Sequence, residues 1–403
     1  MKLAAKRACV GSVAAVMTAG LVACGGGSSK KNAATTTTSS GGAAASISAA
    51  SFTSDFSAMA QLKSLAAQGK GLVGVLLPDT TTSARYVSFD APYLTKAFQT
   101  AGLTQFKVDN AQGSATTMQT QAEADITQGA SVLIVDALDS GSGAAIESNA
   151  ISKGVKVIDY DRLIKGGASG RIYVSFDNVK VGGLIGQGFV DCVQSWSVSH
   201  PNVLVMDGDP TDNNATLFAQ GYNSVINPLF ANGTYTKVGE PAGTWTPAVA
   251  QTTFAQQYTA HPNMNSVVTP NDDNANAVVA YLQSKQIKPK TFPTTGQDAS
   301  KVGLINVLSG FQCGTVYKPI YLEAQAAAAL ALYLRAGQSP PSGLVNATTK
   351  DTQTSTDVQS VYLTPIWVTT QNMASTVVKD GAAKATDICV GAAAAACPAA
   401  GIS

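Results

Sequence analysis

"NVLVMDGDPTDNNATLF", residues 202–218, contains an apolar run, a short polar loop and the start of a second apolar pattern. The run has the continuous apolar character of a strand that is covered on both faces of a parallel sheet. The loop is rich in Asp and Asn, which cap helices and form turns, and a helical pattern follows Asn213. The stretch therefore predicts a strand, a loop and a helix, which together form the repeating unit of an α/β fold.

The same unit recurs along most of the chain. Short apolar runs predict strands at 72–77, 105–109, 131–136, 155–161, 171–177, 202–209, 236–240, 266–272 and 291–298. Amphipathic stretches predict helices near 90–101, 114–128, 142–153, 179–194, from 213 onward, 247–259 and 274–285. The alternation predicts an α/β chain with two successive arrays of strands and helices.

Composition limits the possible functions. The chain has 403 residues, of which 45% are hydrophobic and 13% charged, enough for two domains with sizeable cores. Its net charge of +1 argues against a nucleic-acid partner, which needs a basic surface. The two histidines, His200 and His261, leave little material for histidine catalysis or a His-rich metal site.

The N-terminus has the pattern of a secretory signal. Lys2, Lys6 and Arg7 precede an apolar run at 8–23, which is short for a membrane span. "LVAC" (21–24) resembles a bacterial lipobox, which implies that residues 1–23 are a lipoprotein signal peptide and that Cys24 carries a lipid. An ordinary signal peptide with an incidental cysteine is the alternative.

A low-complexity segment follows Cys24. Residues 25–46 contain no large apolar side chain, and we expect 24–53 to be a disordered tether to the membrane. Export permits disulfides, and the four remaining cysteines allow three pairings. The eight-residue separation of Cys389 and Cys397 favours that pair.

Polar side chains gather where the predicted strands end. In an open parallel sheet, ligands bind outside the carboxyl ends of the strands. Any one of these side chains could be only a helix cap or a turn residue, but the recurrence of Arg, Trp, Asp, Asn and Lys across both arrays indicates a ligand site. The residues are Asp79, Arg85, Tyr86, Asp136, Asp161, Arg162, Asp212, Asn214, Trp245, Asn271, Asp272, Asp298 and Lys318.

This set of side chains favours a sugar as the ligand. Carboxylate, amide and guanidinium groups pair with adjacent hydroxyls, and an aromatic ring covers the C–H face of a pyranose. A phosphate ligand is disfavoured because no GxxxxGK[ST] occurs and no GxGxxG follows the first strand. The loop 208–218 lacks the ligand spacing and the closing Glu of a calcium loop. An amino acid stays a weaker option, and no cofactor or metal is expected.

Seven stretches resemble, in order and spacing, the periplasmic sugar-binding proteins of ABC importers, and among them the D-xylose-binding branch most. The resemblance covers roughly 70–375 and implies two Rossmann-like domains with parallel sheets joined by a three-segment hinge, the type I periplasmic binding protein fold. We expect an N-terminal lobe at 54–165 and 299–345, a C-terminal lobe at 166–298 and 346–380, and a tail at 381–403. The stretches are "SARY" (83–86), "DYDRLI" (159–164), "YVSFDNVKVG" (173–182), "GDPTDNNATLF" (208–218), "VVTPNDDNANAVVAYL" (267–282), "TTGQD" (294–298) and "TVYKPI" (315–320).

Position by position, the resemblance implies a set of sugar contacts. Tyr86 stands where the family often has Trp, and Tyr86, Trp245 or Tyr317 could close the corner that a hexose CH₂OH would occupy. The ligand-binding residues are Arg85, Tyr86, Asp161, Arg162, Asp212, Asn214, Trp245, Asn271, Asp298 and Lys318.

We therefore expect an extracytoplasmic monomer, anchored in the lipid bilayer through Cys24, that delivers a monosaccharide to the membrane permease of an ABC importer. D-xylose is the expected sugar, with a multiple-monosaccharide (glucose or galactose) binder as the alternative, or a sugar sensor for a chemotaxis or kinase receptor. An enzyme is disfavoured because no G-x-S-x-G elbow and no nucleophile–base pair occur. A transcription regulator would need an N-terminal helix-turn-helix in place of the lipobox.

Overall fold

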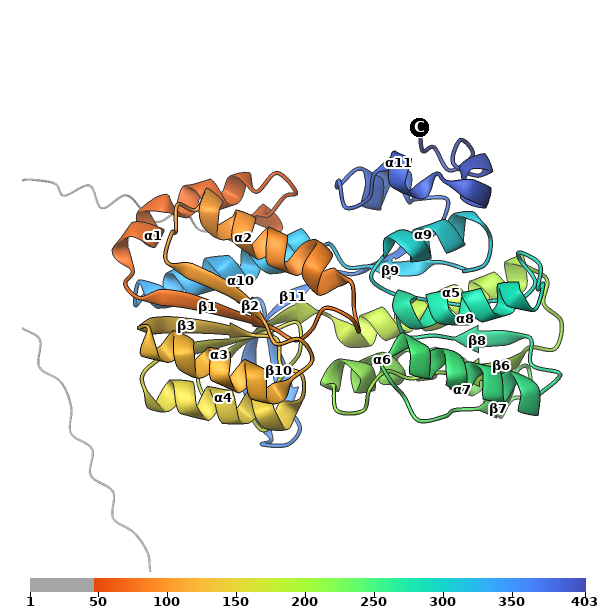
Figure 1. Ribbon diagram of the computed structural model, residues 1–403, viewed down its shortest axis with the longest axis horizontal. Coiled ribbons are helices and arrows are strands. Elements are labelled where there is room, and N and C mark those ends of the chain that lie inside the picture. The colour runs from red at the N-terminus through yellow and green to blue at the C-terminus, as the bar shows by residue number, and fades with distance from the viewer. Residues whose placement is uncertain (1–46) are drawn as a thin grey trace, which may run out of the picture. The chain divides into compact units, whose positions relative to one another are not determined.

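The computed structural model describes residues 47–403, which form two α/β lobes (Figure 1). The predicted signal peptide, Cys24 and most of the predicted tether lie outside the described residues. No helix in the described range is both long enough and apolar enough to cross a membrane.

The first lobe is built on a seven-stranded sheet. Its strand order is β10-β11-β5-β4-β3-β1-β2, and every neighbouring pair is parallel except the edge pair β10–β11. The parallel arrangement confirms the predicted fold class. The strands are β1 (Leu72–Leu77), β2 (Phe106–Asn110), β3 (Ala130–Val135), β4 (Lys156–Tyr160), β5 (Ile172–Phe176), β10 (Ala347–Asp351) and β11 (Thr356–Leu363).

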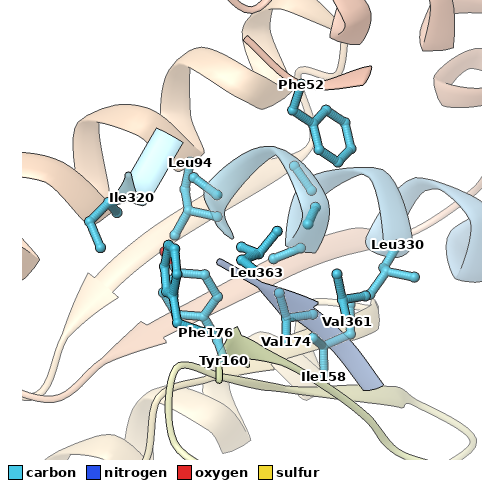
Figure 2. Close-up of a cluster of buried hydrophobic side chains, with 14 of the residues drawn as sticks. Phe52, Leu94, Ile158, Tyr160, Val174, Phe176, Ile320, Leu330, Val361 and Leu363 are labelled. Carbon is cyan, nitrogen blue, oxygen red and sulfur yellow. The ribbon is translucent and has the colours of Figure 1, made fainter. Parts of the chain in front are cut away.

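Helices cover both faces of this sheet (Figure 1). Alternate residues of β1 point to opposite faces: Val73 and Val75 join the core under α2 (Ala91–Thr100) and α10 (Ile320–Arg335), whereas Leu76 joins the core under α3 (Ala115–Thr127) and α4 (Ser140–Ser152). Figure 2 shows the first of these cores, in which Tyr160 and Phe176 of the sheet and Leu330 of α10 are buried together. Two buried faces explain why the strands are continuously apolar.

The predicted tether extends too far along the chain. Ile47 and Phe52 are 2% and 4% exposed and belong to the first-lobe core, where Figure 2 shows Phe52. Because these two apolar side chains can be buried, the ordered part of the chain begins before residue 54. Three short helices follow: η1 (Ala49–Ser51), η2 (Ser57–Leu62) and α1 (Lys63–Gln68).

The second lobe has a three-stranded parallel sheet, β7 (Thr236–Gly239), β6 (Asn202–Val205) and β8 (Ser266–Val268), and an antiparallel pair, β9 (Thr315–Tyr317) with β12 (Ile366–Val368). The predicted strand at 291–298 is wrong, because only Gln297 forms an isolated bridge, to Val316. Five helices surround these strands: α5 (Asn178–Ser195), α6 (Asn213–Ala231), α7 (Pro247–Ala260), α8 (Asp272–Ser284) and α9 (Lys301–Leu308).

The chain crosses between the lobes three times, as predicted, but at later positions. The crossings lie between β5 and α5, between β9 and α10, and between β11 and β12. The expected boundaries at 165/166, 298/299 and 345/346 are therefore wrong. Strand β5 pairs with β4, and β11 pairs with β5, so both belong to the first sheet, whereas β9 pairs with β12 in the second lobe.

The C-terminal tail packs on α9 of the second lobe (Figure 1, dark blue). Met373 and Ile388 bury their side chains against Leu304 and neighbouring apolar residues. Helix η4 (Ala374–Val378) precedes the tail, and the tail itself contains α11 (Ala385–Ile388) and η5 (Gly391–Ala395). The predicted disulfide Cys389–Cys397 is confirmed, and Cys192–Cys313 is the second bridge.

Candidate functional site

One pocket between the lobes is lined by all ten predicted site residues. Its empty volume, which includes space open to solvent, is about 310 Å³. Four further lining residues were not predicted: Thr82, Ser83, Phe218 and Gln297. The ten predicted residues are Arg85, Tyr86, Asp161, Arg162, Asp212, Asn214, Trp245, Asn271, Asp298 and Lys318.

The loop that follows β6 has both a structural and a site role. Asp209 forms a turn, because its Oδ1 accepts hydrogen bonds from the backbone N–H and hydroxyl of Thr211. Asp212 caps α6: its Oδ1 accepts from the backbone N–H of Asn214 at 2.8 Å. Its other oxygen faces the pocket and accepts from Trp245 Nε1 at 3.0 Å. The same carboxylate thus holds the helix end and the aromatic wall of the site.

Arg85 is held by three carboxylates at the first-lobe side. Its Nε and Nη2 donate to both oxygens of Asp90, Nη2 also donates to Glu323, and Nη1 donates to Asp161 at 2.8 Å. Four of the five guanidinium N–H groups are thereby used, which leaves one on Nη1. Tyr160 donates to Asp90 and completes the cluster. This geometry fixes the position of Arg85 before any ligand binds.

Asp161 lies at the centre of the cations. It follows β4 with a left-handed backbone (φ 59°), and its Oδ1 is 2.8 Å from Arg85 Nη1 and 3.7 Å from Lys318 Nζ. Burial alone would raise the pKa of this carboxyl, but the charges of Arg85, Lys318 and Arg162 outweigh burial and lower it to about 2. Asp161 is therefore an ionised hydrogen-bond acceptor throughout the physiological pH range.

Arg162 connects the two lobes. Its Nη2 donates to the Tyr86 hydroxyl at 3.0 Å, and its Nη1 donates to the Ala137 carbonyl. Its Nε is 3.2 Å from Asp212 of the second lobe and 3.5 Å from Asp136, without hydrogen-bond alignment to any described residue. Burial, opposed by Arg162, raises the pKa of Asp136 well above its usual range. Asp136 therefore lies behind the pocket wall as a partner of Arg162.

Other polar contacts also cross the cleft. Asn214 Nδ2 of the second lobe donates to the Asp161 carbonyl at 3.1 Å, and the backbone N–H of Ala84 donates to Asp273 at 3.2 Å. Lys318, at the second crossing, is 3.3 Å from Asp298. These contacts join the lobes in a closed arrangement.

Aromatic rings form part of the wall. Trp245 stands edge-on to Phe218, with ring centroids 6.4 Å apart, and covers Gly208, where any Cβ would collide with the indole. The Tyr86 ring lies 5.3 Å from Arg85 Cζ and 5.8 Å from Arg162 Cζ. Tyr317 is not among the residues that line the pocket, and its hydroxyl donates to Asp380, just before the tail.

Two of the residues at the strand ends, Asp79 and Asp272, lie outside the pocket lining. Asp79 accepts from the backbone N–H groups of Thr81 and Thr82 and closes their turn. Asp272 accepts from Ser300 N and Gln312 Nε2, and burial raises its pKa to about 7. For Asp79 the turn interpretation is correct, whereas Asp272 links the start of α8 to distant segments, and the N-cap of that helix is Asn271.

Comparison with known proteins agrees with this geometry. A family model of the periplasmic binding protein domain matches residues 73–339. The D-xylose-binding periplasmic protein of Escherichia coli (strain K12) is 35% identical over 283 residues, which cover 70% of this chain and 82% of that protein. The multiple sugar-binding periplasmic receptor ChvE of Rhizobium radiobacter is 30% identical over 336 residues, which cover 79% of this chain and 92% of the receptor.

A solved structure shares the fold. The carbohydrate transporter solute binding protein from Chloroflexus aurantiacus, in complex with D-glucose, superposes with a TM-score of 0.71 at 27% identity. The superposition covers 79% of this chain and 98% of that protein.

The two lobes, the three crossings and the polar pocket between them define a solute-binding protein that encloses a small ligand. The chain belongs to the periplasmic binding protein family. Members of this family act outside the cytoplasm as the binding components of transport systems and are not enzymes.

Proposed function

We propose that this protein binds D-xylose in the pocket between its lobes and delivers it to the permease of an ABC importer. The observation that carries the proposal is the closed polar pocket itself, in which three cations and three carboxylates from both lobes face one small space. These groups are Arg85, Arg162, Lys318, Asp161, Asp212 and Asp298.

The pocket keeps hydrogen-bonding capacity for sugar hydroxyls. Arg162 Nε and Asp298 Oδ1 are buried and make no hydrogen bond to the residues that the structure describes. Arg85 retains one N–H. Donors and acceptors are thus mixed, as the vicinal hydroxyls of a sugar require, because each hydroxyl both donates and accepts.

We expect the bulky side chains of the pocket wall to favour a pentose over a hexose. Tyr86, Phe218 and Trp245 line the pocket and add bulk to its wall. The extra CH₂OH of glucose should cost about 1–3 kcal/mol by overpacking, so we expect glucose to bind at least about tenfold more weakly than xylose. Calorimetric titration with a panel of monosaccharides measures this ratio.

Equal or tighter binding of glucose would assign the protein to the multiple-monosaccharide binders, the second candidate, which the similarity to ChvE supports. No binding of any monosaccharide would refute the sugar-binding proposal altogether.

Closure should depend on pH through Asp273. In the closed arrangement, burial raises the pKa of Asp273 from 3.8 to about 6. The nearby charges of Asp298 and Asp79 add to this increase, and the hydrogen bond from Ala84 opposes it. We expect an open cleft to return this carboxyl to water and to its ordinary pKa, so the closed form holds the proton more tightly. The resulting free-energy advantage of the closed form over the open form is complete below the ordinary pKa of Asp273. It is lost as the pH rises through about 6.

Sugar affinity should therefore fall as the pH rises from about 4 to about 7. Titration across this range tests the expectation, and Asp273→Asn should make the dependence shallower. An unchanged slope in Asp273→Asn would show that other groups carry the effect.

We further propose that the protein is a monomer tethered to the membrane through a lipid on Cys24. The exported protein should partition into detergent, and Cys24→Ser should abolish this partitioning or block processing. Intact-mass analysis of the mature chain is the measurement. An unmodified mature terminus at another residue contradicts the lipid anchor without affecting the sugar site.

A further inference from the structure

A second cavity, which we call the tail cavity, lies beside the candidate sugar pocket. Its empty volume is about 970 Å³, and its lining comes from 83–89 of the first lobe, from α8 and α9 of the second lobe, and from 382–388 of the tail. Ser83, Arg85 and Asp298 line both cavities. The two spaces are therefore separated by little more than these side chains.

The tail provides a wall that the matched family domain does not include. The family match ends at residue 339, and the tail lies beyond it. Ile388 is buried in the cluster on α9, and the Cys389–Cys397 disulfide follows directly. This wall of the cavity is accordingly fixed to the second lobe and moves with it.

The lining combines polar groups with apolar surface. Asp273, Asn276 and Ser88 offer a carboxylate, an amide and a hydroxyl, while Phe89 and Val302 offer apolar surface. This combination suits a pyranose ring, which has hydroxyls at its rim and C–H groups on its faces. At the mouth, Lys301 and Asp387 are 62% and 50% exposed and 4.0 Å apart, so both can turn toward a ligand.

We propose that the tail cavity binds the second pyranose ring of a disaccharide whose first ring occupies the sugar pocket. The proposal rests on the sugar-binding function proposed above and extends its substrate class to short pentose oligosaccharides. The glycosidic link would lie at the shared wall, where Ser83 carries a hydroxyl and Asp298 an oxygen without a hydrogen bond to the described residues. Linkage to the first ring raises the effective concentration of the second, so a few polar contacts suffice.

Titration with xylose and with β-1,4-xylobiose, each against three proteins, tests the proposal. Ala383→Phe places a ring in the tail cavity, and Thr386→Phe places the same ring on an exposed position of the same segment, outside the cavity lining. The protein without substitutions should bind both sugars. Ala383→Phe should lower the affinity for xylobiose by roughly tenfold or more and leave the affinity for xylose unchanged. Thr386→Phe should change neither affinity.

The outcomes separate the two proposals. Xylose binding without xylobiose binding overturns the tail-cavity proposal and leaves the proposed function standing, and binding of neither sugar overturns both. An equal loss of affinity for both sugars in Ala383→Phe also overturns the tail-cavity proposal. If Ala383→Phe does not fold, Asp387→Ala replaces it, because the Asp387 side chain is half exposed and its removal does not disturb the core. This variant should lower the affinity for xylobiose alone, by roughly three- to tenfold.

Discussion

Replacing Arg162 with alanine should lower the affinity for xylose by roughly two to three orders of magnitude. The guanidinium lies between the lobes, 3.2 Å from Asp212 and 3.5 Å from Asp136, and all three groups are buried. Removing one member of such a group leaves the charges of the others buried without a partner, which costs about 3–5 kcal/mol. Calorimetric titration measures the loss, and X-ray scattering should show that xylose no longer reduces the radius of gyration.

Lys165→Ala is the matched control, because Lys165 lies on the same segment and has no ion pair to the second lobe within residues 47–403. It should bind xylose normally. Asp212→Ala should weaken binding too, but it should also lower the free energy of unfolding by about 1 kcal/mol, since Asp212 caps α6. Unchanged affinity in Arg162→Ala would mean that the bound sugar does not depend on this link between the lobes.

Removing the Cys192–Cys313 disulfide should have the largest effect on stability. This bridge closes a loop of 121 residues, whereas Cys389–Cys397 closes one of 8. Loop-closure entropy assigns about 4–5 kcal/mol to the first bridge and about 2–3 kcal/mol to the second. Denaturant unfolding of Cys192→Ser with Cys313→Ser, compared with Cys389→Ser with Cys397→Ser, measures both losses.

Xylose affinity should survive loss of the long bridge under native conditions. Both Cys192 and Cys313 belong to the second lobe, so the bridge does not span the cleft. A greater loss of stability from the short tail bridge would contradict the entropic argument.

The sequence predicted which residues meet in the pocket better than it predicted the limits of the lobes. Asp161, Asp212 and Asn271 were found because each follows an apolar strand, and a sheet brings its strand ends together. Phe218 was missed because its place in an apolar helix pattern is typical of a core residue. Gln297 was missed because a single amide in a loop resembles any turn residue.

The support for Arg85 required the three-dimensional structure. Glu323 lies 238 residues away and appears in the sequence as one charge at the start of a helix. The lobe boundaries failed for a similar reason: local pattern identifies a strand but not the sheet that it joins. Only the pairing of β11 with β5 shows that 356–363 returns to the first lobe.

That return has a consequence for how the chain assembles. Strand β11 lies inside the first sheet, between β5 and β10, although it comes later in the sequence than the three strands of the second lobe's parallel sheet. The three-stranded sheet of the second lobe, by contrast, comes from one continuous stretch, 202–268. During synthesis the second lobe can therefore begin to fold while the first still exposes the edge of β5. The N-terminal lobe is begun first, but its sheet is completed only after the three-stranded sheet of the second lobe has been synthesised.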